Sequence, residues 1–262
     1  MKYCCCMGLE PRKLEILKKH GYEAFEVGFS GLTNAEDEKI AEMCGKAREL
    51  GMSCVSHNGM FPGNISLLRG KEGYGEISEY LERTIEKEKP LGSPVVVLGS
   101  GIARNIPDGM SRETAFERFV AMLSDVVVPW AKRNSITVAI EELRKEETNF
   151  INNCREAMEV IRAVDAPEVR LMVDYYHAML GGDRLEEIAS YGDMIRHVHI
   201  ASVRNKRHFP MIDDVGDCRG FFAALKAAGY TRCVSLEGSD GGNFESSIAE
   251  AITVMKEAEK AL

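Results

Sequence analysis

The sequence predicts a TIM (β/α)8 barrel that spans residues 1–262 as a single domain, and three observations support that fold class. Short apolar runs alternate with amphipathic stretches along the chain, and eight such runs are present. A helical stretch that ends in glycine and leads into an apolar run recurs at Gly21, Gly51 and Gly229. A length of 262 residues suits an eight-unit barrel built as one domain.

The eight apolar runs are the expected strands. A doubly wound parallel sheet is the alternative, and it would usually carry a glycine-rich phosphate loop after its first strand. The turn after the first run reads MGLEPRK, which is not such a loop, so the barrel is favoured. In chain order the runs are residues 3–7, 22–28, 52–57, 94–99, 136–141, 169–174, 195–200 and 233–238.

Helical periodicity fills the stretches between the runs. One apolar stripe repeats at the spacing of a single helix face, and Ser111 stands where its N-cap is expected. A shorter stripe follows the last apolar run. The first stripe consists of Phe116, Phe119, Val120, Leu123 and Val127, and the second of Ile248, Ile252 and Met255.

Composition and charge narrow the class of protein. The chain is 45% hydrophobic and 28% charged, which is ordinary for a soluble enzyme. No apolar stretch is long enough to cross a membrane or to form the core of a signal peptide, so we expect a cytoplasmic protein. The formal net charge of −8 disfavours nucleic-acid binding, because the densest basic stretch, residues 204–208, is small for such a footprint.

The eight cysteines show no disulfide framework spacing. Cys4, Cys5 and Cys6 form a cluster in the first apolar run, but adjacent strand residues point to opposite faces, so at most Cys4 and Cys6 share a side. Free cysteine is a common small buried residue. We therefore interpret this cluster as part of a core strand, with a metal site as the alternative.

Polar residues stand where the expected strands end, which is where the active sites of such barrels lie. Side-chain alternation places Glu141, Asp174 and Glu237 on the face opposite the aliphatic residues, and His199 follows by analogy. The aliphatic face should pack under the helices, so these four side chains should point into the barrel mouth. The ends in chain order are Glu26, His57, Glu141, Asp174, His199 and Glu237.

Three carboxylates and one imidazole at consecutive strand ends predict a metal site. Neighbouring strands lie about 4.8 Å apart, so the groups can converge, and the carboxylates would repel one another without a cation. Such a donor set suits Mn²⁺, Mg²⁺, Co²⁺ or Zn²⁺. The alternative is that these residues cap helices or pair with lysines. Glu142 lies on the opposite face from Glu141, towards a neighbouring helix or solvent, and receives no chemical role.

Four motifs carry a family resemblance. They resemble the metal-binding strands of the xylose-isomerase-like sugar phosphate isomerase/epimerase superfamily. Within that superfamily, the resemblance is to the D-tagatose and D-psicose 3-epimerases. The resemblance implies one divalent ion, most often Mn²⁺, a small sugar or sugar phosphate as substrate, and a dimer or tetramer. The motifs are VAIEEL, LMVDYYHA, HVHIAS and VSLEG.

The resemblance also implies residue roles. Glu141, Asp174, His199 and Glu237 would hold the ion, and the two glutamates would also form the acid/base pair. Removing a proton next to a carbonyl gives an enediolate, and its return leads to epimerisation or to aldose–ketose isomerisation; both stay open. Further site residues are His177, Glu147, Arg204 and His57. His177 and Glu147 match substrate contacts of the family.

Arg204 and His57 are expected at the site from their positions in the sequence. The family has an arginine six residues past the metal histidine, where this chain has Asn205, with Arg204 beside it and Arg207 beyond. Arg204 is therefore the candidate contact. His57 ends an expected strand, so it either lines the pocket or is a hydrogen-bonded structural histidine. Arg104, in the turn GSGIARN, either cradles an anion or is a solvated turn residue.

Other functions remain to be weighed against a sugar isomerase. An inosose or polyol dehydratase or isomerase of the same superfamily would use the same metal site. An endonuclease IV-like repair enzyme would need further histidines and an Asp–x–His, yet residues 94–99 and the turn after them lack a histidine, and 204–217 offers no Asp–x–His. A non-catalytic sugar-binding barrel would be expected to lack Glu141 or Glu237, and both are present.

Overall fold

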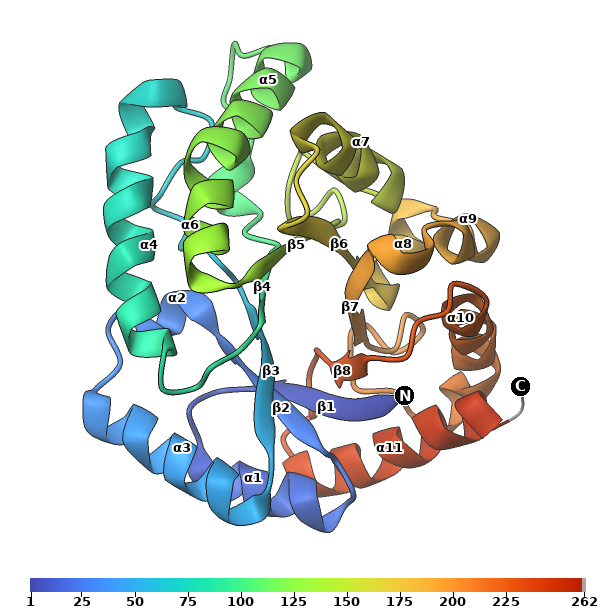
Figure 1. The fold of residues 1–262 in the computed structure, drawn as a ribbon. Coiled ribbons are helices and arrows are strands. Elements are labelled where there is room, and N and C mark those ends of the chain that lie inside the picture. Colours follow the sequence, from blue (N-terminus) through green and yellow to red (C-terminus); the bar gives the residue numbers. More distant parts are fainter. Residues whose placement is uncertain (261–262) are drawn as a thin grey trace.

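The computed structural model describes residues 1–260, in which eight parallel strands close into a barrel (Figure 1). Each strand pairs with the next, and β1 also pairs with β8, so the predicted TIM barrel is confirmed. The strands are β1 Lys2–Met7, β2 Ala24–Gly28, β3 Ser53–Asn58, β4 Val95–Leu98, β5 Thr137–Glu141, β6 Val169–Asp174, β7 Ile195–Ile200 and β8 Cys233–Leu236.

Helices form a ring outside the strands (Figure 1). Ser111 caps α5 by accepting the Thr114 N–H at 3.1 Å, as the sequence predicted. A π-helical turn, Leu123–Val127, joins α5 to α6, so the expected stripe lies on one continuous helical segment. The helices are α1 Pro11–Lys19, α2 Phe29–Leu32, α3 Asp37–Leu50, α4 Tyr74–Glu88, α5 Arg112–Met122, α6 Val128–Asn134, α7 Cys154–Val164, α8 Tyr175–Gly181, α9 Leu185–Ser190, α10 Val215–Ala227 and α11 Phe244–Lys260.

Strand alternation separates two layers of core. Inside the barrel, Ala139 and Met172 pack with Val95 and Val97, and a second inner cluster contains Cys4. The aliphatic residues of the opposite face belong to the large core between strands and helices. This is the arrangement that the alternation predicted. All eight cysteines are free.

Two register shifts decide which strand residues face inward. Phe25 of β2 pairs with Cys54 of β3, but the next residue, Glu26, pairs with Ser56. The extra residue in β3 reverses the alternation after it, because a β-bulge turns each following side chain to the other face. A similar shift in β7 aligns His197 with Met172 and His199 with Asp174.

None of the helices in residues 1–260 is both long and apolar enough to cross a membrane.

Candidate active site at the carboxyl ends of the strands

Four side chains converge at the carboxyl ends of the last four strands. Glu141 and Asp174 end β5 and β6, His199 lies in β7, and Glu237 directly follows β8. One ligand atom from each lies within 4.8 Å of the ligand atoms of the others. His199 Nδ1 is 3.3 Å from Glu237 Oε2 and 4.0 Å from Glu141 Oε1. The structure thus brings together the four residues expected to bind a metal.

Unpartnered atoms within this cluster fit a cation. Glu141 Oε1, Asp174 Oδ2 and His199 Nδ1 are buried and have no hydrogen-bond partner within residues 1–260. Burial and the charge of Glu237 raise the pKa of Glu141 well above its usual range and the pKa of Asp174 to about 6. Three carboxylates and one imidazole form a donor set that a divalent ion would neutralise.

The backbone of the β4 end leaves room for the Glu141 carboxylate. A Cβ at Gly99 would lie 1.9 Å from Glu141 Oε2, closer than any real contact. Only glycine at this position allows the carboxylate its observed place. Gly99, in the turn after β4, therefore contributes to the site because it has no side chain.

Glu26 of β2 orients the imidazole of His199. Its Oε2 lies 3.1 Å from His199 Nε2 and 3.4 Å from Cys6 Sγ, and its Oε1 lies 2.5 Å from His197 Nε2. Burial opposes ionisation, but the two histidines hold the pKa of Glu26 well below its usual range. An ionised Glu26 accepts the Nε2–H of His199, which directs Nδ1 of the same ring towards the cluster. The sequence places Glu26 at a strand end, but nothing in it indicates this role.

Glu237 is held by two residues that sequence reasoning did not assign to the site. Asn58 Nδ2 donates to Glu237 Oε1 at 2.8 Å, and Arg207 Nη2 donates to Glu237 Oε2 at 2.6 Å. Arg207 Nη2 also lies 3.7 Å from Asp174 Oδ2. The carboxylate is therefore fixed in orientation, and one guanidinium lies directly beside the cluster.

His177 and Glu147, the expected substrate contacts, lie at the edge of the same cluster. His177 is fully buried, and its Nδ1 accepts the backbone N–H of Arg144 at 3.4 Å. Its Nε2 has no hydrogen-bond partner within the described chain and lies 3.8 Å from both Asp174 Oδ2 and Glu147 Oε2. Burial and the charge of Arg207 lower the pKa of His177 to about 4. The ring is thus neutral and carries its proton on Nε2.

Arg204 is not brought to the cluster. Its guanidinium is half exposed and pairs with Asp217 at 2.7 Å. Arg207 lies beside the carboxylates instead, because Lys206 and Arg207 both adopt left-handed backbone conformations, with φ of 54° and 65°. These turn the loop back over the barrel, a geometry that residue spacing does not reveal.

His57 is directed away from the barrel mouth. Its Nδ1 lies 3.0 Å from the Val27 carbonyl oxygen, and its Nε2 lies 3.3 Å from Glu88 of α4. The β-bulge in β3 reverses the alternation, so His57 faces the helix layer and Asn58 faces the site. His57 could line the pocket or be a hydrogen-bonded structural histidine, and the geometry matches the second interpretation.

Glu142 and Arg104 are both buried, which corrects the solvent-exposed alternatives. Glu142 Oε1 accepts the backbone N–H of Asp174 at 2.9 Å, and the side chain is inaccessible to solvent. Arg104 donates to the carbonyl oxygens of Leu98, Phe150 and Ile151 at 3.1–3.2 Å. Arg104 therefore ties the turn after β4 to the loop after β5, and it does not cradle an anion.

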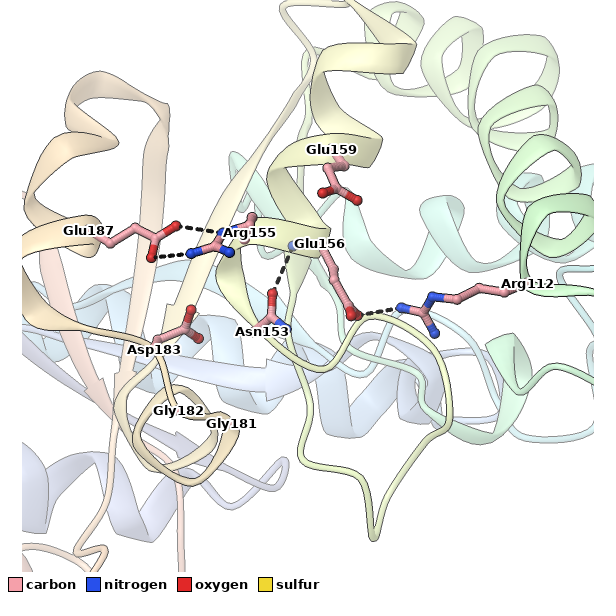
Figure 2. Close-up of a pocket in the computed structure, with 9 residues that line it drawn as sticks. All are labelled: Arg112, Asn153, Arg155, Glu156, Glu159, Gly181, Gly182, Asp183 and Glu187. Atoms are coloured by element: carbon pink, nitrogen blue, oxygen red, sulfur yellow. Dashed lines mark hydrogen bonds and ion pairs between the residues drawn. The ribbon is translucent and has the colours of Figure 1, made fainter.

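A surface cavity of about 310 Å³ lies outside the barrel mouth, beside the start of α7 (Figure 2). Its charged residues are largely paired with one another. Arg155 pairs with Glu187 at 3.0 Å, and Arg112 pairs with Glu156 at 2.6 Å. This compensation gives no electrostatic reason to place a charged ligand there.

Comparisons with known proteins give a family and several relatives. A family model described as xylose isomerase-like TIM barrel matches residues 14–258. The 3-dehydro-D-guloside 4-epimerase of Escherichia coli (strain K12) is 26% identical over 234 residues, which cover 86% of each chain. The 2-oxo-tetronate isomerase of Pectobacterium atrosepticum is 28% identical over 218 residues, 79% of each chain. A solved structure of an L-ribulose 3-epimerase shares the fold with a TM-score of 0.83 at 16% identity, and the match covers 100% of this chain and 95% of that one.

Proposed function

The chain belongs to the xylose isomerase-like TIM barrel family, and within it we propose that this protein is a divalent-metal-dependent sugar epimerase or isomerase. The observation that carries the proposal is the set of buried, unpartnered atoms of Glu141, Asp174 and His199 beside Glu237. Relatives that match most of the chain are named as an epimerase and an isomerase of sugar derivatives, which supports the same reaction class. Mn²⁺ is the ion we would test first, since the donor set is rich in oxygen.

The proposed chemistry moves a proton next to a carbonyl. A bound divalent ion would be held by Glu141, Asp174, His199 and Glu237, and would stabilise negative charge on the substrate's oxygens. Glu141 and Glu237 act as the acid/base pair: one carboxylate removes the proton to give an enediolate, and the other returns it. Burial and the charge of Glu237 raise the pKa of Glu141, which makes this carboxylate a stronger base.

Neighbouring residues hold this pair in place. Asn58 fixes Glu237, Gly99 leaves space for Glu141, and the neutral His177 offers an N–H donor to a substrate oxygen. Return of the proton to the same carbon gives epimerisation, and return to the neighbouring carbon gives aldose–ketose isomerisation. The alternative function is that of a polyol dehydratase, which would use the same ion site and form a dehydrated product.

Deuterium exchange tests the proposal. The Mn²⁺-loaded protein is incubated in D₂O with ketoses, ketose phosphates, 3-dehydro-glucosides, 2-oxo-tetronates and inososes, and proton NMR follows exchange of carbon-bound hydrogen. We expect exchange next to the carbonyl of one substrate class. Glu141→Gln and Glu237→Gln should each lower the exchange rate at least a thousandfold. Glu159→Gln, which changes an exposed carboxylate outside the site, should leave it unchanged.

Metal content is measured in the same samples, so that loss of the ion is distinguished from loss of the acid/base group. Exchange at wild-type rate in either site variant would contradict the assigned roles. A dehydrated product without exchange into recovered substrate would favour the polyol dehydratase. Metal-loaded protein that exchanges nothing with any of these compounds would contradict the proposed reaction.

A further inference from the structure

A second cluster of metal-ligating side chains lies on the outer side of the strands. Glu142 directly follows β5, Cys154 begins α7, and Asp183 comes shortly after α8. One ligand atom from each residue lies within 4.8 Å of the ligand atoms of the other two. Successive strand residues point to opposite faces, so Glu142 points away from the barrel mouth that Glu141 faces. The cluster shares no residue with the candidate active site.

One carboxylate oxygen of this cluster is buried and unpartnered. Glu142 has no solvent exposure, and its Oε1 accepts the backbone N–H of Asp174 at 2.9 Å. Its Oε2 has no hydrogen-bond partner within residues 1–260. A buried polar atom without a partner costs free energy, so this oxygen is available to bind an ion.

The other two members supply a thiol and a second carboxylate. Asp183 accepts the backbone N–H of Cys154, at 3.2 Å through Oδ1 and 3.0 Å through Oδ2, which fixes it at the start of α7. Burial and the charges of Glu142 and Asp183 raise the pKa of the Cys154 thiol well above its usual range. The single thiol proton can serve only one of the two carboxylates. A divalent cation among the three groups would neutralise both carboxylates and stabilise the thiolate.

The surroundings give a cation access and limit the charge left on the cluster. Asp183 lines the surface cavity of about 310 Å³ beside the start of α7 (Figure 2). The charges of that cavity are paired, so it provides a path from solvent and not the binding site itself. Arg104 interacts electrostatically with Glu142, and Arg155 with Asp183. These positive charges offset the one negative charge that a divalent ion leaves on two carboxylates and a thiolate.

We propose that Glu142, Cys154 and Asp183 form a second metal site, which binds Zn²⁺ through one thiolate and two carboxylates. Zinc takes sulfur and oxygen ligands, whereas Mg²⁺ and Mn²⁺ prefer oxygen, so the thiolate distinguishes this site from the one at the barrel mouth. Binding releases the thiol proton to solvent, and a water molecule from the cavity completes four ligands. The ion fixes Glu142, which in turn holds the backbone of Asp174. The site does not depend on the reaction proposed above.

Cobalt spectroscopy tests the site, because a thiolate ligand gives Co²⁺ a strong charge-transfer band in the near ultraviolet. Metal-free protein, kept under a reductant that contains no thiol, is titrated with Co²⁺ and then with Zn²⁺. We expect a band with the amplitude of one cobalt–thiolate bond per chain, and a small excess of Zn²⁺ should remove it, since zinc binds such ligands more tightly. No band at millimolar Co²⁺ overturns the site. A band that survives a tenfold excess of Zn²⁺ overturns the assignment to zinc.

Cysteine variants identify the thiolate. Cys154→Ser should abolish the band. Cys6→Ser is the matched control, because Cys6 Sγ lies 3.6 Å from His199 Nε2, beside the candidate active site, and its loss should leave the band unchanged. A band that survives in Cys154→Ser, or one that is lost in Cys6→Ser, overturns the proposal.

Carboxylate variants keep the proposal testable if Cys154→Ser does not fold. Asp183→Asn retains an oxygen that accepts the Cys154 N–H, and it should weaken Co²⁺ binding, measured by the band, at least tenfold. Glu159→Gln changes an exposed carboxylate of the same cavity and should bind Co²⁺ as the wild type does. Equal Co²⁺ affinity in Asp183→Asn and Glu159→Gln contradicts the assigned ligand set.

One further variant separates this site from the proposed reaction. Glu237→Gln, which alters the candidate active site, should lose deuterium exchange and keep the cobalt–thiolate band. Loss of the band in Glu237→Gln would assign the thiolate to the active site and overturn the second site. Wild-type protein that shows the band and exchanges no hydrogen would support the zinc site and overturn the reaction.

Discussion

At the residue scale, the site depends on a missing side chain as much as on the charged ones. Gly99 is the clearest case, because a Cβ there would lie 1.9 Å from Glu141 Oε2 and 3.0 Å from Glu141 Cδ. The clash falls on the end of a flexible side chain, so the carboxylate would move while the backbone stays. Gly99→Ala should therefore act on the proposed ion site and not on the fold.

We expect Gly99→Ala to weaken Mn²⁺ binding at least tenfold in calorimetry, with a melting temperature of the metal-free protein close to wild type. Gly45→Ala is the control, since Gly45 lies within α3 and an added Cβ would meet nothing within 4 Å. That variant should bind Mn²⁺ normally and gain roughly 0.5–1 kcal/mol of stability from higher helix propensity. Unchanged Mn²⁺ affinity in Gly99→Ala would contradict the view that Glu141 needs this space.

At the element scale, one buried arginine joins the turn after β4 to the loop after β5. Arg104 donates to three backbone carbonyl oxygens, of Leu98, Phe150 and Ile151. Hydrogen bonds from a charged donor contribute about 1.5–3 kcal/mol each, offset here by the cost of burying the charge. Arg104→Met should lower the free energy of unfolding by roughly 3 kcal/mol in urea denaturation.

Arg118→Met provides the comparison for this prediction. Arg118 is exposed and donates to a single carbonyl oxygen, that of Leu68, at 3.0 Å. Its loss should cost less than about 1 kcal/mol. Similar destabilisation in the two variants would show that the three buried bonds of Arg104 contribute no more than one surface bond.

The regularity of each strand determines how much of the site the sequence predicts. Alternation within β5 and β6 placed Glu141 and Asp174 correctly on the inner face, because the aliphatic residues identify the outer one. The fold class and the family resemblance are confirmed as well. At β3 the position of His57 at a strand end left two interpretations open, and the bulge that turns His57 outward and brings Asn58 inward decides between them. A bulge depends on pairing with the next strand, so the sequence of one strand does not reveal it.

Loop geometry accounts for the other differences. Its distance from His199 along the chain makes Arg204 the expected substrate contact, whereas the structure places Arg207 beside the carboxylates. Two successive left-handed residues, Lys206 and Arg207, redirect the loop, and neither is a glycine that would have signalled such a turn. Counting residues along a loop predicts position only where the backbone is regular.

At the scale of the whole molecule, folding buries four carboxylates near the mouth of the barrel. Burying this much negative charge opposes folding unless cations compensate it. The four are Glu26, Glu141, Asp174 and Glu237. Burial and the charge of Glu237 raise the pKa of Asp174 to about 6, above the usual value of about 3.9 for an unfolded chain. A carboxyl group whose pKa is raised by folding contributes its full stability at pH values below its pKa in the unfolded chain. That contribution is lost as the pH rises through the folded-state pKa of about 6. The metal-free barrel should therefore lose stability from this group between pH 4 and pH 7.

A bound divalent ion should reverse that loss, because it binds the ionised carboxylates of the folded state alone. Free Mn²⁺ at a hundred times its Kd should add about 2.7 kcal/mol to the free energy of unfolding. At a fixed Mn²⁺ concentration, the gain in melting temperature should be larger at pH 7.5 than at pH 5, where protons compete for Asp174. Asp174→Asn should abolish most of the gain at both pH values. A gain of equal size at pH 5 and pH 7.5, or one that persists in Asp174→Asn, would mean that Mn²⁺ stabilises the barrel from another site.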